Sequence, residues 1–274
     1  MTAPSLILLG RGGRDPRVAQ VCQQLRAEVG ELRPGLDVHA AFVDNPPTAL
    51  QVINKLVERG ATEVVLTPLN LSDAFSGGPE LSGMLTAIRA AHPGLQVVAS
   101  QPIGPDARLL GIVDRRLREE LRRRRVDDLD GLVFLAEAQN DHERHDQQGQ
   151  DPRSHAIISR RARLWSTHHK LPTVTAYGGD HGPSAADAVR SLLAQGRRHI
   201  AVGSWYLGPT DDYREQSRLA FAAGALAVSS PLGAEPELVE SVISRYVVSA
   251  MDLVDLEPLL TERRPVRHLT AVSA

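Results

Sequence analysis

Short apolar runs alternate with segments of helical periodicity along most of this 274-residue chain, and the alternation limits the possible folds more than any other feature. The apolar runs are brief, rich in β-branched residues and bounded by Gly or Pro, which is typical of buried strands. In the first half the expected strands are residues 5–9, 37–43, 63–69 and 96–100, and the expected helices are residues 16–32, 47–59, 80–91 and 105–124. Strands separated by helices pair in parallel through right-handed crossovers, with helices on both faces of the sheet. The pattern therefore predicts an α/β fold.

The same series starts again in the second half. Its expected strands are residues 132–135, 173–177, 199–205 and 225–229, and its expected helices lie near residues 153–168, 184–195, 213–223 and 235–251. When residues 15–71 are shifted by 136 positions without gaps, 11 of the 57 residues are identical, including Asp, Pro and Gly at βα turns. Unrelated segments would share about a third to a half as many. We therefore predict an internal duplication.

The duplication predicts two tandem similar lobes, each a four-stranded, mostly parallel sheet with flanking helices. The predicted boundaries are residues 1–126 for the N-terminal lobe, 127–255 for the C-terminal lobe and 256–274 for a tail. A charged connection, RRRRVDDLD, joins the lobes at residues 122–130. We interpret its basic run as the solvated end of a helix rather than a binding patch.

Composition and charge narrow the classes of function. The formal charge is −2, with 31 basic and 33 acidic residues mostly interspersed, so we expect no nucleic-acid or membrane partner and a small-molecule ligand instead. The single cysteine, Cys22, excludes an intrachain disulfide and a cysteine-based zinc or iron–sulfur site. The amino terminus has too few apolar residues for a signal peptide, so we expect a cytoplasmic protein, either a monomer or a homodimer.

Ligands of open parallel sheets bind at the carboxyl ends of the strands, where successive loops converge. In the first half these loops are residues 10–15, 44–47, 70–79 and 101–104, and in the second half they are residues 137–150, 178–183, 206–212 and 230–234. We expect the functional site among them.

The opening segment LILLGRGGRDP, residues 6–16, resembles the "strand, then G-H-G-S-R-D-P" start of the sirohydrochlorin cobaltochelatases and ferrochelatases, the CbiX and SirB family. Further similarities are the strand EVVLTPL at residues 63–69, the segment PLG at residues 231–233 and a helix that closes on Arg245 and Tyr246. The resemblance covers residues 5–251, nearly the whole chain.

The resemblance implies insertion of a divalent metal, Fe²⁺ or Co²⁺, into a carboxylate-bearing tetrapyrrole, with Ni²⁺ and Zn²⁺ as further candidate metals. Family members carry one histidine after the first strand and another in the loop after the third strand. Here the first position is Arg11 and the second aligns near Ser76. Arginine stays protonated and only donates hydrogen bonds, so it cannot replace histidine as a metal ligand or a base. The usual metal site of the first half is therefore absent.

Several residues of these loops are candidates for binding or catalysis. Arginine grips carboxylates through paired hydrogen bonds, so Arg11 and Arg14 could bind the acidic rim of a tetrapyrrole, with Ser76 beside them; Arg14 could equally be a solvated helix start. Tyr206 could lie against a planar macrocycle or belong to the core. Glu80 is a candidate for proton transfer or metal binding, although a carboxylate also suits the first turn of a helix.

Histidines cluster in the second half, where six of the ten lie within forty residues. The loop after the first strand of this half is ten residues longer than its counterpart and contains His142 and His145, spaced three apart on one side of a possible helical turn. His181 lies in the neighbouring loop and is a candidate both as a metal ligand and for catalysis, and Asp211 and Asp212 follow the third strand. The alternative is an exposed, flexible loop.

The sequence leaves three functions open. The first is a chelatase whose metal site has moved to the histidine-rich loop of the second half. The second is a non-catalytic carrier or regulator that binds a tetrapyrrole or a metal. The third is an enzyme of altered chemistry on the same fold that acts on another anionic substrate.

Overall fold

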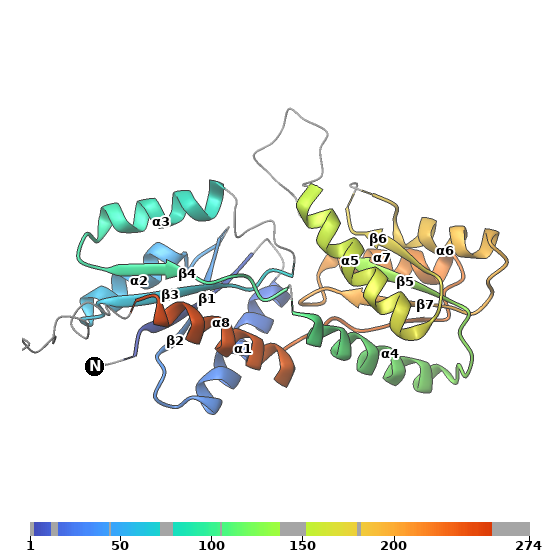
Figure 1. Ribbon diagram of the computed structural model, residues 1–274, viewed down its shortest axis with the longest axis horizontal. Coiled ribbons are helices and arrows are strands. Elements are labelled where there is room, and N and C mark those ends of the chain that lie inside the picture. Colours follow the sequence, from blue (N-terminus) through green and yellow to red (C-terminus); the bar gives the residue numbers. More distant parts are fainter. Residues whose placement is uncertain are drawn as a thin grey trace, which may run out of the picture.

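The computed structural model describes residues 3–11, 16–43, 45–71, 79–104, 106–137, 152–179 and 182–253. It contains two four-stranded sheets, one in each lobe (Figure 1). The first has the order β2-β1-β3-β4 and the second the order β6-β5-β7-β8, and every pair of strands is parallel. The strands are β1 (Ser5–Gly10), β2 (Val38–Phe42), β3 (Glu63–Pro68), β4 (Gln96–Ala99), β5 (Gly131–Ala136), β6 (Thr173–Tyr177), β7 (Ile200–Trp205) and β8 (Ala227–Val228). The predicted two-lobed α/β fold is confirmed.

Eight α-helices connect and follow the strands in the described parts of the chain. They are α1 (Pro16–Leu32), α2 (Ala49–Glu58), α3 (Pro79–Ala91), α4 (Leu110–Arg124), α5 (Pro152–His169), α6 (Ala185–Ala194), α7 (Asp211–Ala222) and α8 (Pro236–Met251). The helix expected from residue 105 begins later, because Asp106 caps a short 3-10 turn, η2 (Ala107–Leu109), that precedes α4. The basic run expected at a helix end is the last turn of α4, where Arg123 and Arg124 bind Glu120.

The two lobes repeat each other in local geometry as well as in strand order. Thr48 and Ser184, which are 136 positions apart, both cap the second helix of their lobe through a reciprocal capping box. Gly60 and Gly196, again 136 positions apart, both follow that helix with a positive φ, of 90° and 86°. These matched details are what a duplicated unit would retain.

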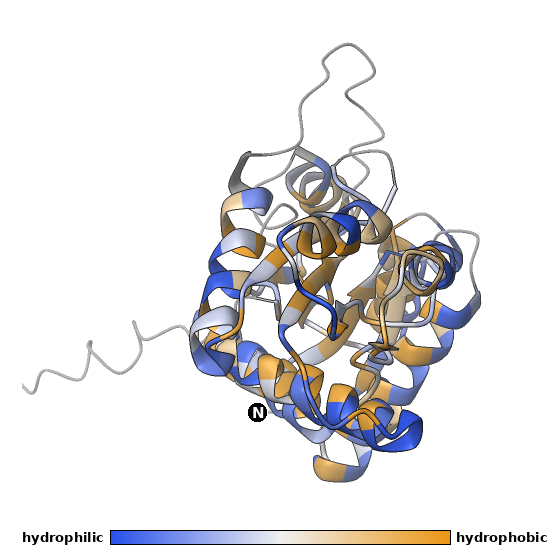
Figure 2. Cartoon of the chain, turned by 90° about the vertical axis from the view of Figure 1, so that its right-hand side faces the viewer, coloured by the Kyte–Doolittle hydropathy of each residue, from blue (hydrophilic) through white to orange (hydrophobic). Residues whose placement is uncertain are grey.

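Alternating strand residues of each sheet face two different cores, one on each side of the sheet. In β1, Leu6 and Leu8 face α1, whereas Ile7 and Leu9 face α2 and α3. Strand β5 repeats the alternation, with Phe134 facing α4 and α5 and its neighbours facing α6 and α7. Figure 2 shows the result as apolar strands inside helices that alternate between apolar and polar faces.

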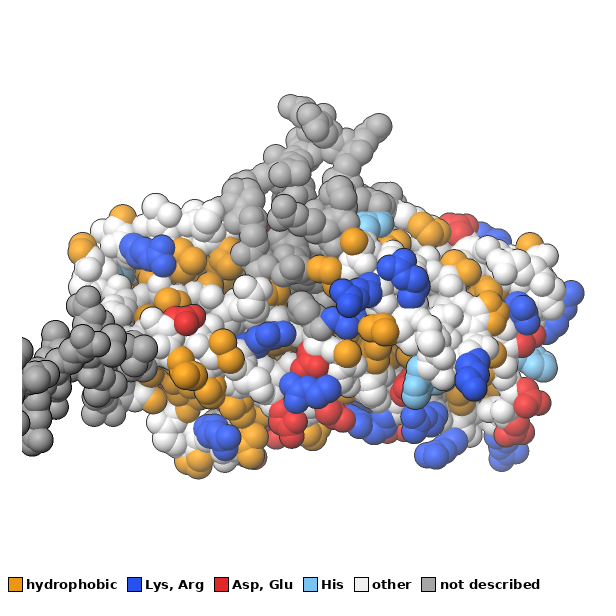
Figure 3. Space-filling view, viewed as in Figure 1, with side chains coloured by type: hydrophobic (Ala, Val, Ile, Leu, Met, Phe, Trp, Pro, Cys, Tyr) orange, Lys and Arg blue, Asp and Glu red, His pale blue; other side chains and the backbone are white. Residues whose placement is uncertain are grey.

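The last helix of each half packs on the sheet of the other half. Helix α4 lies against β7 and β8, and α8 lies against β3, β4 and α1 (Figure 1). Arg115 of α4 binds Glu235 and Glu237 at the start of α8, at 2.7 and 2.8 Å, and Figure 3 shows acidic and basic side chains gathered where the lobes meet. The exchange gives the lobes one continuous core. The boundary predicted after residue 126 separates the two sheets, but it also cuts through the shared core. The boundaries after residues 126 and 255 stay a prediction.

None of the helices that the structure describes is long and apolar enough to cross a bilayer.

Candidate functional site

The central strands β1 and β5 end at equivalent places in the two lobes. Arg11 directly follows β1, and Glu137 directly follows β5. Each central strand has a neighbour on both sides, so its carboxyl end lies in the middle of the edge at which loops converge. The same backbone position therefore carries a cation in one lobe and a carboxyl group in the other.

In the first lobe Arg11 forms an ion pair with Glu80. The Nη2 atom of Arg11 lies 2.7 Å from Oε2 of Glu80, and the two side chains are 31% and 36% exposed. Glu80 is the second residue of α3, where the positive end of the helix dipole favours a carboxylate. The structure thus brings these two predicted site residues together. Arg11 already holds a carboxylate, that of Glu80.

In the second lobe Asp212 occupies the same position on the third helix as Glu80 does in the first. It is the second residue of α7, which is capped by Thr210. Its Oδ1 accepts a hydrogen bond of 3.0 Å from the amide of Gly179, and its Oδ2 accepts one of 2.5 Å from the hydroxyl of Tyr206. A Cβ atom on Gly178 would lie 1.8 Å from Asp212 Oδ2, so the close approach requires glycine.

Tyr206 supports this carboxylate from inside the core. The residue is 0% exposed and packs in the apolar cluster between the second sheet and helices α6 and α7. Burial and the neighbouring carboxylates of Asp212 and Glu137 raise the pKa of its hydroxyl, which therefore acts as a hydrogen-bond donor. No face of the ring is open to a macrocycle here, so its predicted substrate contact stays a prediction.

Glu137 is the titratable group of this edge. Dense surrounding protein and the nearby Asp212 carboxylate raise the pKa of Glu137 to about 7, while the Arg11 guanidinium of the other lobe opposes the rise. Glu137 is thus a carboxyl group with a raised pKa, in electrostatic contact with residues of both lobes.

Glu137 was not among the predicted site residues, although the duplication contains the signal for it. Applying the duplication to Arg11, the residue after the first strand, leads directly to the residue after β5. Asp212, in contrast, was expected as a mirrored group after the third strand. The 136-residue shift adds a third equivalent pair, Asn70 and Tyr206. Both amide atoms of the Asn70 side chain are buried without a hydrogen-bond partner.

The remaining predicted site residues are Arg14, Ser76, His142, His145 and His181, and they all lie outside the described residues. The displaced histidine site therefore stays a prediction. Within the described residues, the ligating atoms of Asp114, His168 and His169 lie within 4.8 Å of one another, on helices α4 and α5.

Comparison with known proteins finds a family model that matches part of the chain and solved structures that share its fold. Residues 5–120 match the sequence model of the CbiX family. A sirohydrochlorin cobaltochelatase from Priestia megaterium is 23% identical over 210 residues, which are 74% of this chain and 64% of that protein. The chain thus spans less than two thirds of the length of this curated relative.

Two solved structures share the fold over almost the whole chain. SirB from Bacillus subtilis, solved with Fe³⁺, superposes with a TM-score of 0.72 at 16% identity, over 92% of this chain and 97% of SirB. SirB from Bacillus subtilis subspecies spizizenii, in complex with cobalt, has a TM-score of 0.67 at 16% identity, over 91% and 96% of the two chains. The two-lobed arrangement is therefore that of SirB.

Proposed function

We propose, from the match of residues 5–120 to the CbiX family model, that this chain is a chelatase-type enzyme that combines a divalent metal with a carboxylate-bearing tetrapyrrole. We propose Fe²⁺ or Co²⁺ as the metal, since the similar proteins include a cobaltochelatase and structures solved with Fe³⁺ and with cobalt, and the metal enters the reaction as a substrate. The residues described at the edge between the lobes supply a proton acceptor and an anion-binding group for this chemistry.

The observation that carries the proposal is the pKa of Glu137, raised to about 7 beside Asp212. A metal enters a tetrapyrrole only when pyrrole N–H protons leave, so the reaction needs a base. A base works best when its pKa lies near the working pH, because it is then available in the deprotonated form and still binds a proton firmly. In this proposal Glu137 accepts one of the two pyrrole protons that metallation releases, and the other passes to solvent.

Asp212 and Tyr206 have positioning roles in the proposal. Asp212 is held by the Gly179 amide and the Tyr206 hydroxyl, and its negative charge keeps the pKa of Glu137 high. Carboxylate oxygens also bind hard or borderline divalent ions, so the pair could receive the incoming metal. His142, His145 and His181 are proposed as additional metal donors from the second half.

Arg11 is proposed to bind a substrate carboxylate. In the structure its guanidinium is paired with Glu80, at 2.7 Å, and a substrate carboxylate could take the place of Glu80 without leaving a buried charge unpaired. Glu80 would then be available as a second carboxylate. Its predicted role in proton transfer depends on that exchange.

The test is a direct metallation assay. Purified protein is mixed with sirohydrochlorin and Fe²⁺ or Co²⁺ without oxygen, and the absorption change of the macrocycle is followed against a protein-free control. The proposal expects a rate well above the control. A rate equal to the control at every metal concentration would contradict it.

A carrier is the second candidate function, and the Arg11–Glu80 ion pair favours it, because an arginine replaces the histidine that the family resemblance leads one to expect. The same assay separates the two functions. A carrier would bind the macrocycle, as measured by a shift of its absorption spectrum and by co-elution, while the metallation rate stayed that of the control.

A further inference from the structure

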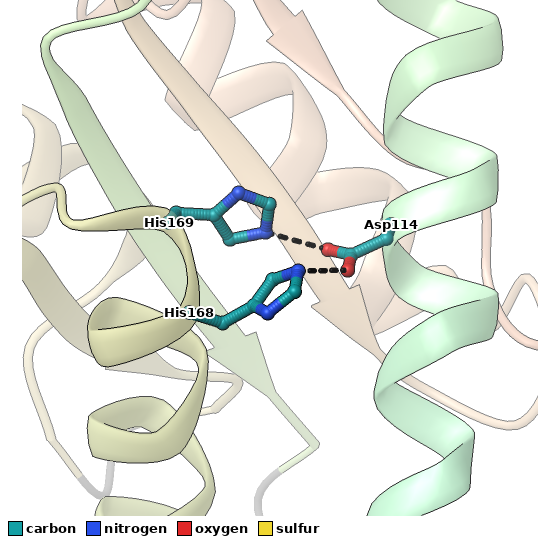
Figure 4. A group of neighbouring side chains, drawn as sticks. All are labelled: Asp114, His168 and His169. Carbon is teal, nitrogen blue, oxygen red and sulfur yellow. Dashed lines mark hydrogen bonds and ion pairs between the residues drawn. The ribbon is translucent and has the colours of Figure 1, made fainter.

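Two consecutive histidines at the end of α5 are turned toward one buried carboxylate of α4 (Figure 4). Asp114 is 7% exposed, and its Oδ1 accepts hydrogen bonds from Nε2 of His169 at 2.8 Å and from Nε1 of Trp165 at 2.6 Å. Nε2 of His168 lies 3.8 Å from the other oxygen, Oδ2. All three residues point at the same small volume.

Ordinary hydrogen bonding accounts for only part of this arrangement. It explains His169 and Trp165, which both lie within bonding distance of Oδ1. It does not explain His168, because 3.8 Å is too long for a hydrogen bond. Successive residues of a helix point about 100° apart, so a direct approach of two neighbouring rings to one carboxylate is not what a regular helix favours. Helix α5 ends at His169, and Lys170 follows with a φ of 55°.

The spacing fits three ligands around one metal ion. Ligands bound at about 2.0–2.1 Å in a tetrahedral site are separated by about 3.3 Å, and the ligating atoms here lie within 4.8 Å of one another. The Trp165 N–H on Oδ1 orients the carboxylate and leaves Oδ2 directed at His168, as an outer partner of a metal ligand does. His168 is 68% exposed, so an ion could enter from solvent.

We propose that Asp114, His168 and His169 form a binding site for a borderline divalent transition-metal ion of the Zn²⁺ class. Two imidazole nitrogens and one carboxylate oxygen suit such an ion and leave a fourth position for water. The site is independent of the function proposed for Glu137 and Asp212, because it shares no residue with that edge.

The site joins the two halves of the chain. Asp114 belongs to the exchanged helix α4, and the histidines belong to α5 of the second half. Both helices pack in the same shared core, where Trp165 lies beside α4. A bound ion would link α4 to α5. It would also stabilise the folded chain by mass action, because the unfolded chain does not assemble the three ligands.

The test uses the full chain with His142, His145 and His181 all replaced by Ala, so that the loop histidines contribute no binding. Zn²⁺ is titrated calorimetrically, and Co²⁺ is used as a spectroscopic probe of tetrahedral ligation. His168→Ala is the decisive variant, because His168 is exposed and makes none of the hydrogen bonds that hold Asp114. His92→Ala is the matched control. His92 lies in the first lobe and bonds to Asn54 of the same lobe, whereas the proposed histidine ligands belong to the second lobe.

We expect one Zn²⁺ per chain, an intense tetrahedral Co²⁺ spectrum and a melting temperature that rises with Zn²⁺. His168→Ala should weaken Zn²⁺ binding about 10- to 100-fold and abolish the Co²⁺ spectrum, with an unchanged melting temperature in the absence of metal, whereas His92→Ala should leave binding unchanged. Absence of Zn²⁺ binding in the parent, or binding that survives His168→Ala unchanged, would overturn the proposal.

Discussion

In the first lobe, the residue after the central strand is Arg11, and it pairs with Glu80 at the start of the third helix at 2.7 Å. In the second lobe, the residues at the same two positions are Glu137 and Asp212, both acidic. The same backbone positions therefore hold an ion pair in the first lobe and two acidic residues in the second. Burial and the neighbouring Asp212 carboxylate raise the pKa of Glu137 to about 7, whereas Arg11 and Glu80 pair with each other.

The third pair of equivalent positions, Asn70 in the first lobe and Tyr206 in the second, also differs between the lobes. Tyr206 is fully buried and its hydroxyl is satisfied by Asp212, so its position is complete without a ligand. Asn70 follows β3, which pairs with β1 in parallel. The amide of Leu69 donates to the carbonyl of Leu9. If this register is continued along each strand, Asn70 lies opposite Arg11. Its amide atoms lack partners. Burying an amide without a hydrogen bond costs about 1–3 kcal/mol, so the first lobe retains polar groups that a ligand could satisfy.

The two lobes thus share one backbone arrangement but carry different functional groups at equivalent positions. The first lobe offers a cation and an unsatisfied amide, which are groups that bind an anion. The second lobe offers a carboxyl group with a pKa near neutrality, which is a group that moves a proton. The following experiments would break or sharpen that division.

The largest expected effect is that of Glu137→Gln on metallation. Losing a positioned base should lower kcat about 10²- to 10⁴-fold. The wild-type rate should rise with pH through about 7, because only the deprotonated Glu137 accepts a proton, and the variant should lack that rise. Glu240→Gln on α8, whose carboxylate is 61% exposed, is the control. Equal pH profiles of wild type and Glu137→Gln would refute the assignment.

Arg11→Gln should act on binding rather than on proton transfer. Losing a charge-assisted contact of about 1.5–3 kcal/mol should raise KM for the tetrapyrrole about 10- to 100-fold, with a smaller change in kcat. The variant also removes the cation that lowers the pKa of Glu137, so the rise of the rate should move to higher pH. Steady-state kinetics across pH measure both effects, and an unchanged KM would assign Arg11 to structure alone.

Gly178→Ala should disturb the second lobe by crowding its carboxylate. The added methyl group would lie 1.8 Å from Asp212 Oδ2 and 2.3 Å from the Tyr206 hydroxyl, so we expect the free energy of unfolding to fall by about 1–3 kcal/mol. The equivalent residue of the first lobe is Val43, whose amide donates to the carbonyl of Gly10 as that of Gly178 donates to Ala136. Gly111→Ala is the control, because nothing lies within 4 Å of the new methyl group. Chemical denaturation measures the free energy of unfolding of both variants. Equal values for Gly178→Ala and Gly111→Ala would argue against the close approach.

The smallest effect is a pH-dependent change in stability that needs no substrate. Folded protein holds the Glu137 proton up to about pH 7, whereas the unfolded chain releases it near its ordinary pKa of 4.5. The folded state therefore binds more protons in this window, and stability falls as pH rises from about 4.5 to 7. Glu137→Gln lacks this loss, so its melting temperature relative to wild type should be higher at pH 8 than at pH 5. A pH-independent difference would contradict the raised pKa.

Much of the fold could be predicted because it is written in local patterns. Buried strands such as β1 and β5 are short apolar runs, and the capping residues Thr48 and Ser184 mark helix starts. The exchange of α4 and α8 could not be predicted in this way. Amphipathic periodicity shows that a helix buries one face, but it does not show against which sheet.

The sequence by itself determined the order of strands and helices, the duplication and the presence of arginine rather than histidine at residue 11. Only the tertiary structure decided that Arg11 binds Glu80, 69 residues away, and that Glu137 lies beside Asp212. The physical reason is range. Secondary structure follows from residues within a few positions of one another, whereas a pKa depends on every charge and every apolar group that folding brings near the carboxyl.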